Sequence, residues 1–133
     1  MCSNDVMKLV EIYQCLCDPT RVRIIALLAH RSLCVCHIQE ILGKTQVKVS
    51  KHLAYLKERG VVEVKREANW RIYCLNRHPS KLLQANLDAL RTCEADEPIL
   101  ARDAVRLRKL EGQFDENGPF CAPKSLRHST KTT

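Results

Sequence analysis

The feature that most constrains the fold of this chain is a change in the spacing of its apolar residues at Gly60. Between residues 33 and 56 the apolar side chains follow a helical period, and Gly43-Lys44-Thr45 divides this stretch into two short helices. After Gly60 they alternate, in residues 62–65 and again in residues 70–74, which predicts a β-hairpin. Two helices that meet at a tight turn and precede a hairpin predict a winged helix-turn-helix.

Further helical segments complete a mainly α fold with a small β-hairpin. The first ends before Asp18, which caps a second helix that reaches about Ala29. Leucines at helical spacing mark another helix in residues 82–93, and residues 98–110 can form a last one. All these helices are amphipathic, so each is expected to bury one face.

Positive charge is concentrated on the second short helix and the hairpin. Residues 44–71 hold eight Lys or Arg against three Glu, a net +5 of the formal net charge of +7. Such a stretch favours a polyanionic partner, and a helix-turn-helix places its second helix in the major groove of double-stranded DNA. His52 either donates to a phosphate or packs beside the hairpin. The predicted DNA-binding residues are Gln46, Lys48, Ser50, Lys51, His52, Arg66, Asn69 and Arg71.

The chain of 133 residues is long enough for one modest core. We predict one winged helix-turn-helix domain in residues 1–111, which binds DNA and dimerises, and a flexible C-terminal tail in residues 112–133. The first and fifth helices are the expected dimer interface, because their apolar stripes exceed what one small core can cover. These stripes are Val6, Leu9, Val10 and Tyr13, and Leu83, Leu87 and Leu90.

Cys34 and Cys36 lie at the start of the first short helix, separated by one residue. No apolar run approaches the roughly 20 residues of a membrane span, and no signal peptide precedes the domain, so we expect a cytoplasmic protein without a membrane partner. In that compartment, eight cysteines indicate metal ligands or redox chemistry. Residues two apart point about 200° apart on a regular helix, so this pair can chelate only from extended or first-turn backbone. There the helix dipole is expected to lower their thiol pKa.

A third ligand is left open. Trivalent arsenic takes three thiolates, whereas cadmium, lead or zinc accepts three or four ligands. His37 can offer a nitrogen to zinc, but a histidine beside a basic segment is more often a solvated surface residue. Cys15 and Cys17 fit better as packing residues, as do Cys74 and Cys93. The candidates for the third ligand are Cys2, Cys15, Cys17 and Cys121.

Four short motifs carry a resemblance to a known family: Cys17-Asp18-Pro19-Thr20-Arg21, Leu33-Cys34-Val35-Cys36, Val49-Ser50-Lys51-His52-Leu53-Ala54-Tyr55-Leu56 and Trp70-Arg71-Ile72-Tyr73. Residues 5–110 closely resemble the ArsR/SmtB family of metal-sensing repressors. The resemblance implies a winged-helix homodimer that binds operator DNA when empty and releases it when an ion binds. The Leu-Cys-Val-Cys form resembles the arsenite/antimonite and cadmium/lead branches. In the latter, N-terminal cysteines reach across the dimer, a role that would fall to Cys2.

The expected function is therefore a repressor that arsenite or antimonite, bound by cysteine thiolates, releases from an inverted-repeat operator. Two alternatives keep the same fold: a repressor that responds to cadmium, lead or zinc, and one that responds to thiol oxidation. An oxidoreductase enzyme would be expected to show Cys-x-x-Cys beside a βαβ unit, and this chain has neither. We expect no catalysis.

Overall fold

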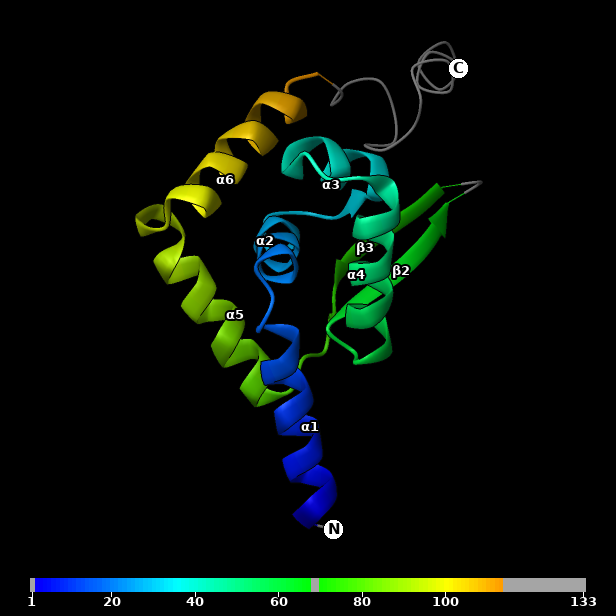
Figure 1. The fold of residues 1–133 in the computed structure, drawn as a ribbon, viewed down its shortest axis with the longest axis vertical. Helices are drawn as coiled ribbons and strands as arrows, with labels where there is room; N and C mark the ends of the chain where they lie inside the picture. Colours follow the sequence, from blue (N-terminus) through cyan, green and yellow to red (C-terminus); the bar gives the residue numbers. More distant parts are fainter. Residues whose placement is uncertain (1, 68–69, 114–133) are drawn as a thin grey trace.

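The computed structural model describes residues 2–67 and 70–113, with side chains from Val6 onward. Its elements confirm the predicted fold class, a mainly helical winged helix-turn-helix (Figure 1). The expected tail beyond residue 113 and the side chains of Cys2, Asn69 and Cys121 lie outside the described residues. The elements are α1 (Cys2–Cys15), α2 (Pro19–Leu28), β1 (Leu33–Cys34), α3 (Val35–Leu42), α4 (Gln46–Glu58), β2 (Val62–Glu67), β3 (Trp70–Leu75), α5 (Lys81–Cys93), the 3-10 turn η1 (Glu94–Asp96) and α6 (Pro98–Glu111).

Local capping groups set the ends of the central helices. Asp18 Oδ1 accepts hydrogen bonds from the backbone N–H groups of Thr20 (2.8 Å) and Arg21 (3.1 Å) at the start of α2. Gly43 ends α3 with a φ of 68°, a conformation in which a β carbon would be strained. Thr45 Oγ1 then accepts from the N–H of Lys48 (3.2 Å) and begins α4. The turn between α3 and α4 is therefore fixed by its own residues.

The core forms around α2, which contacts α3, α4, α5, α6 and β3 (Figure 1). Leu83 and Leu87 of α5 are only 4% and 3% exposed, because they pack into this core. Their assignment to a dimer interface was wrong, since α5 uses its apolar stripe within the chain.

No helix within the described ranges combines the length and apolar character needed to cross a bilayer.

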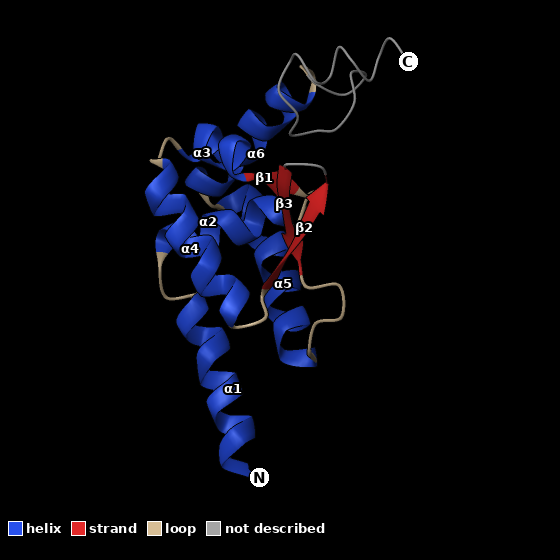
Figure 2. Ribbon diagram, turned by 90° about the vertical axis from the view of Figure 1, so that its right-hand side faces the viewer, coloured by secondary structure: helices blue, strands red, loops and turns tan. Residues whose placement is uncertain are grey.

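The helix α1 extends away from the rest of the chain in both views (Figures 1 and 2). Its apolar face is exposed, and four large side chains on that face are the ones predicted for a dimer interface: Val6, Leu9, Val10 and Tyr13. Cys15 near its C-terminal end is fully buried, as predicted. Cys17 and Cys93 are exposed, so the prediction that they pack in the core was wrong. Cys17 falls in the turn after α1, and Cys93 ends α5 beyond its buried leucines.

The three strands form one antiparallel sheet in the order β1-β3-β2 at one edge of the helical body (Figure 2). The predicted hairpin is confirmed as β2 and β3, which form the wing. The two-residue strand β1 was not predicted. It places Cys34 opposite Ile72 of β3, so the cysteine motif is hydrogen-bonded to the wing.

Candidate metal centre and DNA-facing surface

Cys34 and Cys36 come together at the junction of β1 and α3. Cys34 is the N-cap residue of α3 and has extended backbone angles (φ −93°, ψ 168°), whereas Cys36 lies in the first turn. Their Sγ atoms are hydrogen-bonded at 2.8 Å. The structure thus provides the break in helical geometry that a chelating Cys-x-Cys pair needs.

His37 belongs to the same cluster. Its Nδ1 lies 3.6 Å from Cys34 Sγ, and one ligand atom from each of the three residues lies within 4.8 Å of the others. In the described part of the chain, this is the one group of three His, Cys, Asp or Glu residues close enough to hold an ion. His37 is only 7% exposed, so the expectation of a solvated surface residue was wrong. His37 lies four residues before Ile41, on the buried face of α3, and sequence reasoning did not use this spacing.

In the ion-free protein, the thiol of Cys36 holds its proton more tightly than an ordinary cysteine does. The pKa of Cys36 is raised above its ordinary value, first because its thiol is hydrogen-bonded to Cys34, and also because of burial and the charge on Cys34. The expectation that the helix dipole would lower this pKa was therefore wrong, since these contacts outweigh it. Metal ligands must be deprotonated, so an ion that binds both sulfurs has to displace the proton of Cys36.

Cys15 and Cys17, the two proposed third ligands whose side chains the structure describes, do not join this cluster. Cys15 is enclosed in the core near the C-terminal end of α1, and burial raises the pKa of its thiol. Cys17 is exposed in the turn before α2. Sequence reasoning undervalued His37, although its spacing of three residues from the N-cap was visible.

The group of Cys34, Cys36 and His37, the candidate metal centre, is in contact with the wing. Cys34 and Ile72 form a small buried cluster, and Trp70 packs against it. Cys34 therefore touches β3 on one side and begins α3 on the other. A change at this residue reaches both the wing and the helix-turn-helix.

The helix α4 presents a polar face to solvent. Val49, Leu53 and Leu56 are buried against the rest of the domain. Four of the residues predicted to bind DNA are exposed along the same helix: Gln46, Lys48, Ser50 and Lys51. This is the arrangement expected of a recognition helix, whose N-terminal residues meet base edges.

Two arginines lie side by side on the wing. Arg66 of β2 and Arg71 of β3 are exposed and directly opposite in the strand register. Like charges in this arrangement destabilise a sheet when nothing lies between them. The pair is therefore suited to an anionic partner such as a DNA phosphate.

His52 points back to the domain. It is half-buried, and its Nε2 lies 3.9 Å from Oδ1 of Asp18 at the start of α2. Nearby, the guanidinium groups of Arg21 and Arg59 stack on the ring of Tyr55, at 4.1 and 3.5 Å from its centre. These contacts hold α4 against α2.

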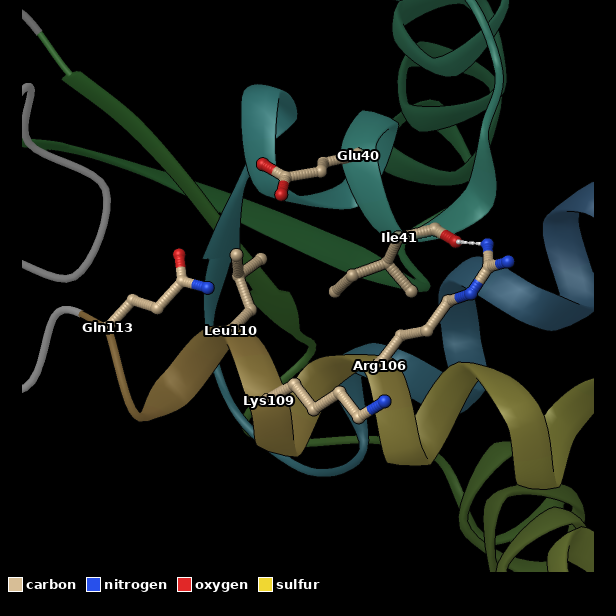
Figure 3. A pocket seen from close by; sticks show the side chains of 6 residues that line it. All are labelled: Glu40, Ile41, Arg106, Lys109, Leu110 and Gln113. Atoms are coloured by element: carbon tan, nitrogen blue, oxygen red, sulfur yellow. Dashed lines mark hydrogen bonds between the residues drawn. The ribbon is translucent and has the colours of Figure 1, made fainter.

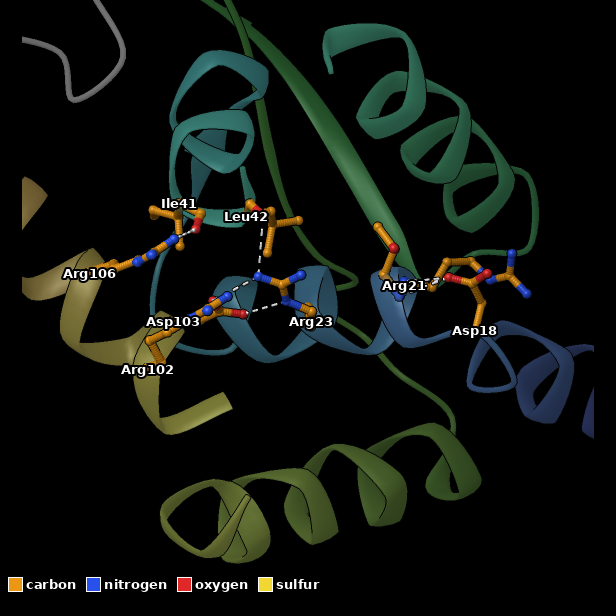
Figure 4. A network of polar contacts seen from close by, with 9 residues as sticks. Asp18, Arg21, Arg23, Ile41, Leu42, Arg102, Asp103 and Arg106 are labelled. Atoms are coloured by element: carbon orange, nitrogen blue, oxygen red, sulfur yellow. Dashed lines mark hydrogen bonds and ion pairs between the residues drawn. The ribbon is translucent and has the colours of Figure 1, made fainter. Parts of the chain in front are cut away.

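A buried polar network joins α6 to the end of α3, and sequence reasoning missed it (Figure 4). Asp103 accepts two hydrogen bonds from the guanidinium of Arg23, at 2.8 and 3.0 Å, and Arg23 also donates to the carbonyl of Leu42 (3.3 Å). Arg106 donates to the carbonyl of Ile41 (3.0 Å) beside a pocket of about 180 Å³ between the two helices (Figure 3). The last carbonyls of α3 are thus held by α2 and α6.

Comparison with known proteins adds evidence on the family to which the chain belongs. The family model described as "Bacterial regulatory protein, arsR family" matches residues 18–64. The arsenic resistance transcriptional regulator ArsR1 of Pseudomonas putida is 33% identical over 112 residues, which cover 84% of this chain and 85% of that protein. The chain belongs to the arsR family. This arsR-family protein is a DNA-binding transcriptional repressor and not an enzyme.

Two further matches support the family and fold. The arsenical resistance operon repressor of Escherichia coli is 32% identical over 89 residues, 66% of this chain and 76% of that protein. The structure of HlyU from Vibrio cholerae superposes with a TM-score of 0.61 at 25% identity, covering 68% of this chain and 96% of that one. The family-model match to residues 18–64 includes the helix-turn-helix and the candidate metal centre.

Proposed function

We propose that this arsR-family repressor binds operator DNA when it is empty and releases it when a thiophilic ion binds Cys34 and Cys36. The observation that carries the proposal is the position of the thiol pair, at the start of the helix that precedes α4. Arsenite and antimonite are the first inducers to test. Soft thiolates favour such ions, and two relatives are named for arsenic resistance.

The proposed coupling runs in two directions from the centre. An ion that replaces the proton between the sulfurs changes the first turn of α3, and α3 packs against α4. The same change alters Cys34, which pairs with Ile72 of the wing. Couplings between sites are typically worth about 1–3 kcal/mol, enough to change operator affinity by about 5- to 150-fold.

A response to cadmium, lead or zinc is the second candidate, and the buried His37 favours it, since an imidazole suits zinc better than arsenite. A relative from Staphylococcus aureus is named as a cadmium resistance regulatory protein. The test is operator binding by fluorescence anisotropy, titrated with each ion in the presence of a reductant. Release under these conditions would contradict the redox alternative, and release by none of the ions would contradict the proposal.

Lys51→Ala tests the proposed DNA surface. If Lys51 contacts a phosphate, we expect uniformly weaker DNA binding and a slope of log affinity against log salt concentration that is lower by about 1. If it contacts guanine, we expect a loss of about 1–3 kcal/mol in discrimination at one base position. The control is Lys109→Ala, an exposed lysine on α6. An unchanged salt dependence together with unchanged specificity would move the DNA surface away from this face of α4.

We also propose that the protein is a homodimer on an inverted-repeat operator, since one recognition helix reads too few base pairs for specificity. Sedimentation should give about twice 15.2 kDa with and without ion. Because Leu9 is 43% exposed on α1, Leu9→Glu should give a monomer that stays folded. Val105→Glu, an equally exposed apolar residue on α6, is the control. A wild-type monomer that binds one half-site would contradict this assembly.

A further inference from the structure

We infer that His37 is a direct third ligand, which with Cys34 and Cys36 forms a site for a divalent ion of borderline softness such as zinc. The inference rests on the proposed function, because it concerns which ions the same centre binds. It adds an imidazole to a thiol pair that by itself favours arsenite.

The backbone of α3 brings the imidazole to the thiols. Cys34 is the N-cap residue and His37 is the third helical residue, the two positions at which, in a capping box, each side chain reaches back to the backbone N–H of the other residue. Here Cys34 makes no side-chain hydrogen bond of the capping kind. The side chains at these positions instead place Sγ and Nδ1 3.6 Å apart.

The distances suit a tetrahedral ion after one small movement. With zinc at about 2.3 Å from sulfur and about 2.1 Å from nitrogen, the sulfur–nitrogen edge of the tetrahedron is about 3.6 Å and the sulfur–sulfur edge about 3.8 Å. The distance from Cys34 Sγ to His37 Nδ1 already matches, at 3.6 Å. The Sγ–Sγ distance of 2.8 Å has to increase by about 1 Å. Cys36 is exposed and has room to rotate outward, whereas Cys34 and His37 are buried.

Ion chemistry separates two uses of the centre. Imidazole nitrogen is a good ligand for zinc, whereas trivalent arsenic takes thiolates. In this chain zinc would therefore use all three residues, and arsenite only the cysteine pair. Removing the imidazole should weaken zinc binding and spare arsenite binding.

The experiment compares the reduced, full-length wild type with His37→Ala. Zinc affinity is measured by competition with a chelator, and X-ray absorption of the zinc-loaded protein counts sulfur and nitrogen neighbours. We expect the variant to lose a nitrogen neighbour and about 100-fold or more in zinc affinity, since even changes to residues behind the ligands cost about 10- to 100-fold. Arsenite affinity should stay close to the wild-type value. His78→Ala, at an exposed histidine, is the matched control.

Trp70, the single tryptophan, packs against Cys34 and Ile72, so its fluorescence provides an independent reading of ion loading. A second variant, His37→Cys, replaces the imidazole with a smaller side chain that tolerates burial and gives the site three thiolates. It should bind arsenite more tightly than the wild type while losing the nitrogen neighbour. This variant tests the inference even if alanine at this buried position prevents folding.

The outcomes distinguish the inference from the proposed function. Unchanged zinc affinity and an unchanged nitrogen shell in either variant would overturn the role of His37 and leave a thiol-based sensor intact. Equal losses of zinc and arsenite affinity in a folded variant would overturn the separation of the two ion classes. If neither ion binds the wild type, the proposed function itself fails.

Discussion

Serine at Cys34 or Cys36 is expected to abolish ion-driven release while leaving operator binding by the ion-free protein almost unchanged. The sulfur atoms lie at the start of α3, whereas the proposed DNA contacts lie on α4 and the wing. A hydroxyl is close in size to a thiol but is a poor ligand for soft ions. Where the ion lowers wild-type operator affinity by about 5- to 150-fold, the variants should show no measurable change. Anisotropy of a labelled operator, with and without ion, measures both quantities.

Cys36→Ser is the cleaner of the two variants, because Cys36 is exposed and Cys34 is 5% exposed within a small buried cluster. Cys93→Ser is the matched control, since Cys93 is an exposed thiol at the end of α5. It should retain full release. Weakened operator binding by both ion-free serine variants would instead show that the pair supports packing.

The elements that carry their own local signals could be predicted from the sequence. Asp18 and Thr45 cap helices with short-range hydrogen bonds, and Gly43 adopts the left-handed conformation that ends α3. The wing follows from the alternation in residues 62–65 and 70–74, which lie within β2 and β3. These signals act between near neighbours in the chain, so they need no knowledge of the tertiary structure.

The strand β1 could not be predicted in this way. It has two residues, Leu33 and Cys34, and two residues show no period. Its existence depends on pairing with Tyr73 and Ile72 of β3, far away in the sequence. The contact between the cysteine motif and the wing was therefore visible only in the structure.

For α5, the sequence predicted that the apolar side chains are buried, but it did not predict which surface covers them. The stripe of Leu83 and Leu87 was recognised as apolar, but periodicity does not say whether the covering surface belongs to the same chain. His37 shows the opposite error, because a polar side chain is buried beside two cysteines. Its spacing from Ile41 places it on the buried face of α3, but a polar side chain at the end of an apolar stripe was taken for a surface residue.

The sequence contained a signal for the buried ion pair between Arg23 and Asp103, and sequence reasoning did not use it. Asp103 shares the helical face of Leu100, Ala104 and Leu107, so an acidic residue there has to find a partner inside the domain. Arg23 lies between Val22 and Ile24 on α2 and supplies that partner. Two opposite charges on two buried faces therefore predict a contact between α2 and α6.

Asp103→Ala is expected to lower the free energy of unfolding by about 3–5 kcal/mol. Asp103 is 2% exposed, and its loss would leave the guanidinium of Arg23 buried without its carboxylate. That is a large part of the roughly 5–15 kcal/mol available to a small domain, and urea unfolding measures it. The control is Asp88→Ala on the exposed face of α5, with a change within about 0.5 kcal/mol.

The same variant should also weaken operator binding without reducing ion affinity. Arg23 donates to the carbonyl of Leu42, the last residue of α3, so a displaced Arg23 releases the end of α3 that leads into α4. The proposed ligands lie at the other end of α3 and are expected to keep their contacts with each other and with β3. A loss of stability below about 1 kcal/mol would show that water or another side chain takes over from Asp103. Unchanged operator affinity in the folded variant would show that the turn between α3 and α4 is held by its own caps alone, and that α6 stabilises the domain without positioning the recognition helix.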